Sequence, residues 1–287
     1  MRVPRYNLRE MGLIYAGTSG WAYSSWKPGF YPRDLGPAGF LAHYAGRLNS
    51  VEVNFTFRNA LTAELLDDWI RATPRDFIFA VKAHQEITHF KRLRGAVRGT
   101  RKFLASLRAL EKSKKLGPVL FQLPPNFKCD LALLKHFVTR LPQNYRFAFE
   151  FRHPSWFNKD VYEMLRGANV ALCLAESEKL VTPEVATADF SYLRLRKDHY
   201  SAVARAKLAE KIRNLAQRGD VFAYFKHEDK PDGARHAERL LEFVQSISKD
   251  AGLKPSATIA RRYRSARRAH YASRKTGVIQ FRAARFE

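Results

Sequence analysis

The segment RFAFEF at residues 146–151 carries the alternation that decides the fold. Its three phenylalanines share one parity, whereas Ala148 and Glu150 share the other. Successive side chains of a β-strand point to opposite faces, so this segment predicts a strand with one apolar face and one face that ends in a carboxylate. A helical stretch at 159–167 follows, which is typical of one strand–helix unit.

The same unit recurs along residues 13–248, where eight short β-rich runs alternate with helical stretches. This is the outline of an α/β protein with a (β/α)8 TIM-like barrel. A doubly wound open sheet is the alternative, because periodicity cannot show closure, but the number eight favours the barrel. The predicted strands are 13–17, 51–57, 77–82, 119–123, 146–151, 170–175, 191–196 and 221–226. The predicted helices are 39–47, 62–72, 98–114, 131–141, 159–167, 203–218 and 234–247, with Thr62 and Asp130 as N-caps.

Length and composition fit one domain with two extensions. The chain has 287 residues, 46% hydrophobic and 13% aromatic, which argues against global disorder. We divide it into an N-terminal extension at 1–12, the barrel at 13–248 and a basic tail at 249–287 that we expect to be disordered. Without a long apolar run, an apolar signal core or more than two cysteines, the chain is expected to be cytoplasmic, with no membrane span.

The charge of the chain indicates a polyanionic partner. Fifty-one Lys and Arg against 27 Asp and Glu give a net charge of +24, well beyond what solubility requires. In the tail, arginines are interleaved with tyrosines, a pattern that could neutralise phosphates while the rings stack on bases. A merely solubilising extension is the alternative. The predicted nucleic-acid-binding residues are Arg261, Arg262, Arg264, Arg267 and Arg268.

Polar side chains occupy the late positions of one parity in six of the eight predicted strands. The carboxyl ends of barrel strands carry the chemistry in this fold class. A buried charge costs several kcal/mol unless it is paired, so Glu52 and Glu150 would need Lys82, Arg152 or Arg194 nearby. We therefore predict that Glu52, Lys82, Glu150 and Arg194 converge around one cavity at the barrel mouth. A structural salt-bridge network at the rim is the alternative.

Carboxylates among fixed cations suit general acid–base work on an anionic or hydroxyl-rich substrate. Aromatic side chains after the first and fifth strands could stack on a sugar or a base, or could plug the barrel mouth. The catalytic candidates are Glu52, Glu150, Lys82 and His89. The substrate-binding candidates are Asn54, Gln122, Arg152, His153, Trp156, Arg194, Trp21 and Tyr23.

Motifs for a metal or a nucleotide cofactor are not found in the sequence. It has no HExxH, GxGxxG or GxxxxGK[ST] pattern, so we predict no metal ligands and no cofactor. A divalent metal stays open, because several acidic and histidine residues lie near strand ends. The segment GTSGW lacks GxSxG spacing and does not support Ser19 as a nucleophile.

Seven segments, in this order, together resemble the YecE-like family, also known as domain of unknown function 72. The resemblance implies a TIM-like barrel with a polar pocket at its top and names no reaction. The segments are GTSGWAYSSWKPGFYP (17–32), VEVNFTF (51–57), FAVKAHQEITH (79–89), LFQLPPNF (120–127), FEFRHPSW (149–156), TADFSYLRL (187–195) and VFAYFKH (221–227). The matching pocket positions are Glu52, Asn54, Lys82, His89, Gln122, Glu150, Arg152, His153, Trp156 and Arg194.

The chain departs from the family pattern at three places around the pocket. The family usually has Ser and then Tyr near its asparagine motif, Arg-x-His-Gly after the seventh strand and Phe-x-Asn after the eighth. Two of the three departures introduce cations, which predicts a changed substrate or a weakened ancestral activity. The residues found here are Phe55 and Arg58, Arg194-Leu195-Arg196-Lys197, and Phe225-Lys226-His227.

Three functions follow from these patterns. The first is a hydrolase or lyase that acts on an anionic, phosphate-bearing or nucleic-acid-derived substrate in the mouth pocket. The second is a nucleic-acid-binding protein with little or no catalysis that uses its basic surface and tail. The third is a sensor that binds a small anion without turnover. The expected partner is thus a small anion or a nucleic acid, and the oligomeric state stays open.

Overall fold

The computed structural model describes residues 11–176, 180–197, 200–226 and 230–250, with side chains described as far as residue 244. Most of the N-terminal extension and the predicted tail (249–287) beyond residue 250 lie outside these ranges, and residues 249 and 250 belong to the last helix. The nucleic-acid-binding prediction for the tail therefore falls outside the described residues, as does the departure at His227. The tail residues concerned are Arg261, Arg262, Arg264, Arg267 and Arg268.

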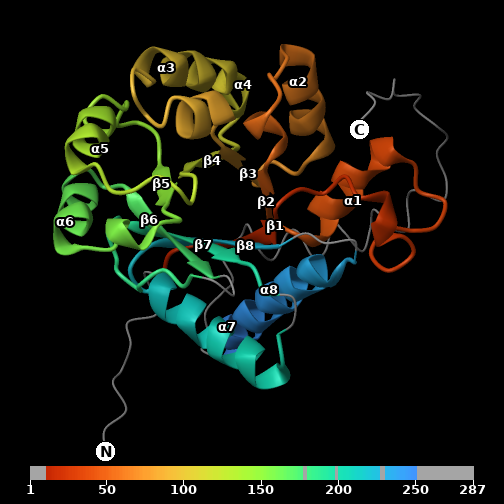
Figure 1. The fold of residues 1–287 in the computed structure, drawn as a ribbon. Coiled ribbons are helices and arrows are strands. Elements are labelled where there is room, and N and C mark those ends of the chain that lie inside the picture. The colour runs from red at the N-terminus through yellow and green to blue at the C-terminus, as the bar shows by residue number, and fades with distance from the viewer. Residues whose placement is uncertain (1–10, 177–179, 198–199, 227–229, 251–287) are drawn as a thin grey trace, which may run out of the picture.

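Eight parallel strands form one sheet that curls into a nearly closed barrel (Figure 1). The strand order is β1-β8-β7-β6-β5-β4-β3-β2, so the first and last strands are neighbours. This order confirms the predicted TIM-like barrel over the doubly wound alternative. The strands are β1 (Ile14–Thr18), β2 (Ser50–Val53), β3 (Ile78–Lys82), β4 (Leu116–Gln122), β5 (Phe147–Glu150), β6 (Ala171–Glu176), β7 (Phe190–Leu195) and β8 (Asp220–Phe225).

Side chains join β1 to β2, the one neighbouring pair of described strands without a backbone ladder. The Asn49 side chain spans this seam: its Oδ1 accepts from the Ala16 N–H at 2.8 Å, and its Nδ2 donates to the Ile14 carbonyl at 2.8 Å. A side chain at position 17 could not be accommodated, since a Cβ on Gly17 would lie 1.9 Å from the Ser50 carbonyl oxygen. Asn49 thus supplies the hydrogen bonds that a ladder would otherwise make.

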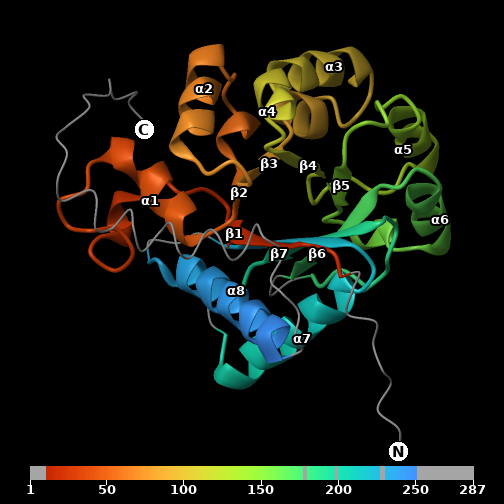
Figure 2. The same cartoon turned by 180° about the vertical axis from the view of Figure 1, so that it is seen from behind.

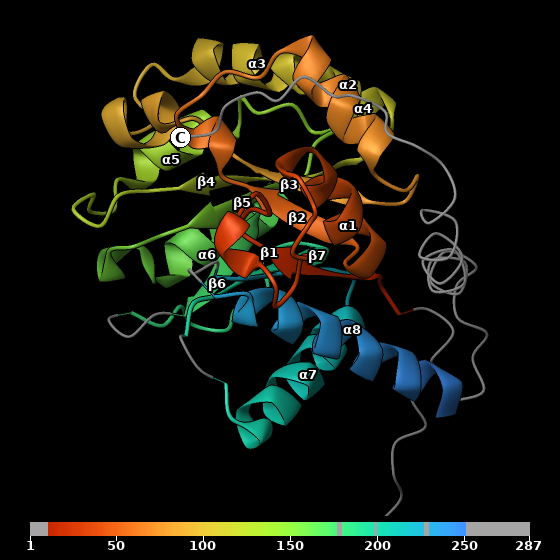
Figure 3. The ribbon, with the colours of Figure 1, turned by 90° about the vertical axis from the view of Figure 1, so that its right-hand side faces the viewer.

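Helices cover the outside of the barrel (Figures 2 and 3). The longest two, α7 and α8, pack against each other, and α8 also packs on β1 and β8. No described helix has the length and apolar character that a membrane crossing needs. The helices are α1 (Phe40–Arg47), α2 (Ala63–Ala72), α3 (Val97–Ser106), α4 (Arg108–Lys112), α5 (Leu131–Val138), α6 (Lys159–Gly167), α7 (Ala202–Ala216) and α8 (Asp232–Asp250).

Two predicted elements differ from the structure. The predicted strand 51–57 ends at Val53, because Asn54 adopts helical backbone angles and a 3-10 turn follows at Phe55–Phe57. The predicted helix 98–114 is broken at Leu107 into α3 and α4. Leu107 is fully buried at this break, so the break places its apolar side chain in the core.

Both predicted N-caps are confirmed. The Thr62 hydroxyl accepts a hydrogen bond from the Leu65 N–H at 3.2 Å, and the Asp130 carboxylate accepts one from the Leu133 N–H at 3.0 Å. Each bond satisfies a backbone donor that the first turn of a helix leaves unpaired.

The alternation along the strands separates two buried layers. One parity packs outward against the helices, and the other fills the barrel interior as a smaller cluster. Because the lower and middle interior is filled, the barrel is a packed core whose polar positions lie at the carboxyl ends of the strands. The interior cluster consists of Ala80, Leu120, Ala148, Ala171, Cys173, Phe190, Tyr192, Phe222 and Tyr224.

Candidate functional site

The inward parity of the strands ends in a buried polar group at the barrel mouth. Lys82, Gln122 and Glu150 are the last residues of β3, β4 and β5. Gln122 pairs in register with Glu150, so their side chains emerge at one level. We call the following residues the mouth cluster: Ser19, Glu52, Lys82, Gln122, Glu150, Tyr192, Arg194 and Arg196.

Arg194 joins the two carboxylates of the mouth cluster. Its Nη2 and Nε donate to Glu52 Oε1 at 2.8 and 3.2 Å, and its Nη1 donates to Glu150 Oε2 at 2.5 Å. All three side chains are buried. A guanidinium has donors pointing in several directions, which is why one arginine can hold two carboxylates. The predicted convergence of Glu52, Glu150 and Arg194 is therefore observed.

Glu52 is fully buried and saturated with donors. Ser19 Oγ donates to its Oε1 at 2.6 Å, the Tyr192 hydroxyl donates to its Oε2 at 2.8 Å, and Arg196 Nη2 lies 3.3 Å from Oε1. Burial alone would raise the pKa of the Glu52 carboxyl, but the positive charges of Arg194 and Arg196 outweigh it and hold that pKa well below its usual range. Glu52 is thus a fixed negative charge.

Glu150 is held by Arg194 and by an amide. Gln122 Nε2 donates to both Glu150 oxygens, at 2.9 and 3.0 Å. Burial would raise the pKa of Glu150, but the nearby guanidinium charges of Arg194 and Arg196 lower it. Both carboxylates are consequently ionised at neutral pH.

Lys82 is the exception in this cluster, since its ammonium has no ion-pair or hydrogen-bond partner within the described residues. The residue is only 9% exposed, and its Nζ lies 3.8 Å from the centre of the Phe57 ring. Burial, reinforced by the positive charge of Arg194, lowers the pKa of Lys82 to about 8. A buried amine of this kind can gain or lose a proton near neutral pH.

His89 lies next to this lysine, on a π-helical turn at Glu86–Phe90. Its ring packs edge-on against Phe57, with centroids 4.9 Å apart, and its Nδ1 lies 2.9 Å from Thr88 Oγ1. Burial and the positive charge of Lys82 lower the pKa of His89. Phe57 therefore stands between two groups that can carry protons.

The remaining polar candidates form the rim. Arg152 is exposed and its Nε lies 4.0 Å from Glu150 Oε1. His153 caps a 3-10 turn, because its Nδ1 accepts from the Ser155 N–H at 3.2 Å. Asn54 lies directly after β2, and its buried Oδ1 has no hydrogen-bond partner in the described structure. An unsatisfied buried acceptor of this kind is available to a ligand donor.

The three aromatic candidates lie in different surroundings. Trp156 is fully buried, stacks on Phe151 at 4.6 Å and donates its indole N–H to the Phe127 carbonyl at 2.7 Å. The substrate contact predicted for Trp156 therefore has no exposed surface in this structure. Trp21 packs edge-on against Trp69, which makes it part of the core.

Tyr23 is partly buried and belongs to the loop after β1. Its hydroxyl donates to the Ser19 carbonyl at 3.0 Å. This hydrogen bond ties Tyr23 to the backbone of a residue in the mouth cluster. Of the three aromatic candidates, Tyr23 is the one placed beside the polar site.

Sequence reasoning did not assign Ser19, Phe57, Tyr192 and Arg196 to the site. Tyr192 and Arg196 share the parity of Arg194, so the alternation along β7 was a usable signal for both. Ser19 was considered only as a nucleophile. In the structure its hydroxyl donates to Glu52 and accepts from Arg196 Nη2 at 2.9 Å. The departure from the family pattern at position 196 thus contacts the mouth cluster itself.

The described ranges also bear on metal binding. There, no three His, Cys, Asp or Glu side chains come together as a possible metal site. Glu52 and Glu150 are instead joined through Arg194. The mouth cluster therefore holds two fixed carboxylates and three buried or half-buried cations, of which Lys82 alone forms no salt bridge with the described residues.

Comparison with known proteins gives a family and a fold. Residues 15–260 match the family described as "Protein of unknown function DUF72". The chain is 32% identical to the UPF0759 protein YunF of Bacillus subtilis over 163 residues, and 31% identical to the UPF0759 protein YecE of Escherichia coli K12 over 148 residues. These matches cover 53% and 51% of this chain and 55% and 51% of the two relatives, so they span about half of each relative's length.

A solved structure agrees with the barrel. The crystal structure of a DUF72 family protein from Thermotoga maritima superimposes with a TM-score of 0.72 at 26% sequence identity. The alignment covers 81% of this chain and 99% of that protein. The barrel described above is therefore the fold of a solved relative.

Proposed function

The chain belongs to the DUF72 family, and from the geometry of its barrel mouth we propose that it is an enzyme of the hydrolase or lyase type. The proposed substrate is an anionic, phosphate-bearing or nucleic-acid-derived molecule, and the proposed active site is the mouth cluster. One observation carries the proposal: Lys82 is only 9% exposed, and its ammonium forms no salt bridge or hydrogen bond with the described residues.

Lys82 is the proposed proton-transfer group. A buried ammonium without a partner destabilises the folded protein, and such groups occur at functional sites more often than elsewhere. With a pKa of about 8, part of the Lys82 population is neutral at pH 7 and can accept a proton from the substrate or from water. The ammonium so formed can return the proton to a leaving group.

Glu52 and Glu150 are proposed to act as fixed charges. Both are held by Arg194, and both have lowered pKa values. A carboxylate that keeps its charge is suited to orienting cations and stabilising positive charge, and poorly suited to giving up a proton. The catalytic contribution of these two residues is therefore electrostatic positioning around Lys82.

The substrate anion is proposed to bind at the rim. Arg196 and Arg152 extend beyond the buried carboxylates, and their side chains are 16% and 48% exposed. Guanidinium groups match phosphate and carboxylate oxygens in pairs. Asn54 Oδ1 can accept from a substrate hydroxyl, and His89 can carry protons between Lys82 and solvent.

The proposal is tested by turnover. Phosphomonoesters, phosphodiesters, phosphorylated sugars, nucleotides and short oligonucleotides are incubated with the full chain and with three variants. Lys82→Met should lower turnover about 10²-fold or more. Lys82→Arg should preserve ligand-induced thermal stabilisation while losing turnover, because it keeps the charge and not the basicity. Lys135→Met, an exposed lysine on α5, is the matched control.

Two alternatives are outcomes of the same experiment. If a small anion stabilises the protein against heat and no substrate is turned over, the protein is a sensor and not an enzyme. If oligonucleotides bind in a salt-sensitive way and are not turned over, the protein is a non-catalytic nucleic-acid-binding protein. Turnover that survives in Lys82→Met would contradict the assignment of Lys82.

A further inference from the structure

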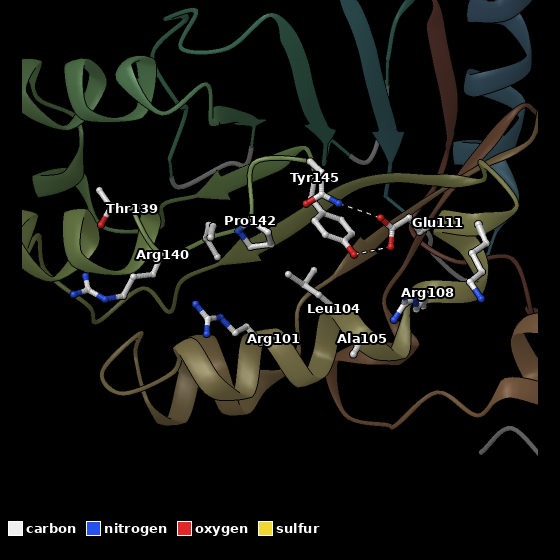
Figure 4. Close-up of a pocket in the computed structure, with 12 residues that line it drawn as sticks. Arg101, Leu104, Ala105, Arg108, Glu111, Thr139, Arg140, Pro142 and Tyr145 are labelled. Carbon is white, nitrogen blue, oxygen red and sulfur yellow. Dashed lines mark hydrogen bonds between the residues drawn. The ribbon is translucent and has the colours of Figure 1, made fainter.

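A groove of about 870 Å³ (Figure 4) is lined in part by residues that shortly precede β4 and β5, so it lies toward the amino-terminal ends of these strands and away from the barrel mouth. One wall is formed by α3 and α4, and the other by residues 139–145, which lead from α5 into β5. Its volume lies in the range of sites that bind small molecules or parts of polymers. Nothing in the proposed chemistry of the mouth cluster involves this groove.

Cations line both walls of the groove. Arg101, Arg108 and Lys112 come from α3 and α4, and Arg140 comes from the facing segment. All four side chains belong to exposed residues, and none has a carboxylate partner among the described residues. Because the cations are not neutralised, the groove presents a positive potential to solvent.

Glu111 is the one acidic residue among the described residues that line the groove, and its carboxylate already accepts hydrogen bonds. Glu111 accepts from Asn144 Nδ2 at 3.0 Å and from the Tyr145 hydroxyl at 2.7 Å, bonds that cross between the two walls. These bonds fix the far end of the groove and hold the Tyr145 ring in place (Figure 4). Glu111 therefore shapes the groove without pairing with its cations.

Between the cations the groove is apolar. The apolar part of the lining consists of Leu104, which is buried on α3, and the half-buried Pro142 and Tyr145, which face it from the other wall (Figure 4). A positive groove with flat apolar and aromatic surface suits a polymer that carries phosphates on one side and bases on the other. An acidic peptide would pair with the cations without stacking on the flat surface. A free phosphate would contact only one or two of the cations.

The positive charge continues past the groove. Arg98, Lys102 and Lys114 flank the lining cations along the same segment, are exposed, and have no ion pair within the described residues. Arg98 and Lys102 lie on α3 (Val97–Ser106), which alone is about 15 Å long at helical geometry. A stripe of this length spans several phosphates of an extended strand.

We propose that this groove binds single-stranded nucleic acid. The phosphates lie against Arg101, Arg108 and Arg140, and the bases lie against Pro142 and Tyr145. A flexible single strand can follow the groove between its walls, whereas a stiff duplex has to stay outside it. Binding at this face does not depend on turnover at the mouth cluster.

The test is fluorescence anisotropy with a labelled 20-nucleotide oligo-dT, using the full chain at 50 to 300 mM salt. The double variant Arg101→Ala/Arg140→Ala removes one cation from each wall. Arg33→Ala/Arg239→Ala removes the same charge from exposed arginines outside the groove. We expect the groove variant to bind roughly tenfold more weakly at 100 mM salt, with a log–log salt slope about 1.4 shallower, because each lost phosphate contact contributes about 0.7 for a single strand.

Several outcomes would overturn the proposal. These are no binding of oligo-dT by the unmodified chain at 50 mM salt, equal weakening in both double variants, or no change in the groove variant. Tighter binding of a 20-base-pair duplex than of the single strand would also contradict it. Circular dichroism and thermal unfolding establish that both variants are folded before binding is compared.

Discussion

Arg194 donates two hydrogen bonds to a single oxygen of Glu52, from Nε at 3.2 Å and from Nη2 at 2.8 Å. The remaining guanidinium nitrogen, Nη1, donates to Glu150 Oε2 at 2.5 Å. One cation is thus shared between two buried carboxylates that lie on strands far apart in the sequence. Among the described residues, this arrangement leaves Lys82 without a salt bridge, and the proposed chemistry depends on that consequence.

Replacing Arg194 should destabilise the barrel strongly. Arg194→Ala leaves both carboxylates buried without their main counter-ion, and breaking a buried ion pair in this way costs about 3–5 kcal/mol. The free energy of unfolding from urea titration at pH 7 measures the loss. Arg152→Ala, which removes an exposed guanidinium from the same rim, should change it by less than about 0.5 kcal/mol. Equal losses in the two variants would mean that the network is not a stabilising element.

Removing the Lys82 charge should have the opposite effect on stability. The pKa of Lys82 falls from 10.5 to about 8 on folding, so the unfolded chain binds the proton more tightly. The cost is fully present below about pH 8 and disappears as the pH rises through 10.5. Lys82→Met should therefore raise the free energy of unfolding at pH 7 by up to about 3 kcal/mol, with the gain vanishing above pH 10.5.

A second buried lysine provides the contrast. Lys115 Nζ donates to the carbonyls of Ile70 and Thr73, at 2.9 and 2.8 Å, and to the Thr73 hydroxyl at 2.7 Å. Lys115→Met leaves those acceptors unpaired and should lower the free energy of unfolding by about 1–3 kcal/mol. A destabilising Lys82→Met would place Lys82 in the same structural class as Lys115.

Acid should weaken the fold through Glu52 and Glu150. Arginine charges lower both pKa values in the folded state, so the stabilisation is present above the ordinary value of 4.5 and is lost as the pH falls below it. The free energy of unfolding, measured by urea titration, should fall as the pH is lowered from 6 to 3. In Glu150→Gln the fall should be shallower, because one titrating group is gone. An unchanged pH dependence in that variant would contradict the lowered pKa of Glu150.

The seam between β1 and β2 should depend on Asn49. Asn49→Ala removes the partners of the Ala16 N–H and the Ile14 carbonyl and should cost about 2 kcal/mol. Asn59→Ala is the matched control, because it removes an exposed amide that, within the described part of the chain, donates to the Phe55 carbonyl alone. Faster hydrogen exchange at Ala16 in Asn49→Ala would locate the effect. If the Ala16 amide of Asn49→Ala exchanges at the wild-type rate, the seam does not rely on this side chain.

The barrel and most of the mouth cluster follow from alternation along the strands. Parallel strands in register bring positions of one parity to one level, so Lys82, Gln122, Glu150 and Arg194 meet without further information. The same rule would have added Tyr192 and Arg196. The rule could not predict which cation lacks a salt bridge. Pairing depends on distances of a few ångströms, and periodicity carries no information about them.

Other features depend on tertiary contacts that a single sequence does not report. The break at Leu107 and the end of β2 at Val53 are set by local packing and backbone angles. The burial of Trp156 depends on a loop folding back onto Phe151. The groove is formed by α3 facing residues 139–145, and helix periodicity predicts a polar face without saying what lies opposite it.

The proton affinity of the Lys82 amine tests the central claim most directly. Competitive labelling with trace acetic anhydride from pH 6 to 11, followed by peptide mass spectrometry, gives the apparent pKa and the reactivity of each lysine in the folded chain. The structure predicts an apparent pKa of about 8 for Lys82, against an ordinary lysine value of 10.5. A Lys82 amine that titrates above pH 10, or that is not labelled at any pH in the folded protein, would contradict an available basic amine at the barrel mouth.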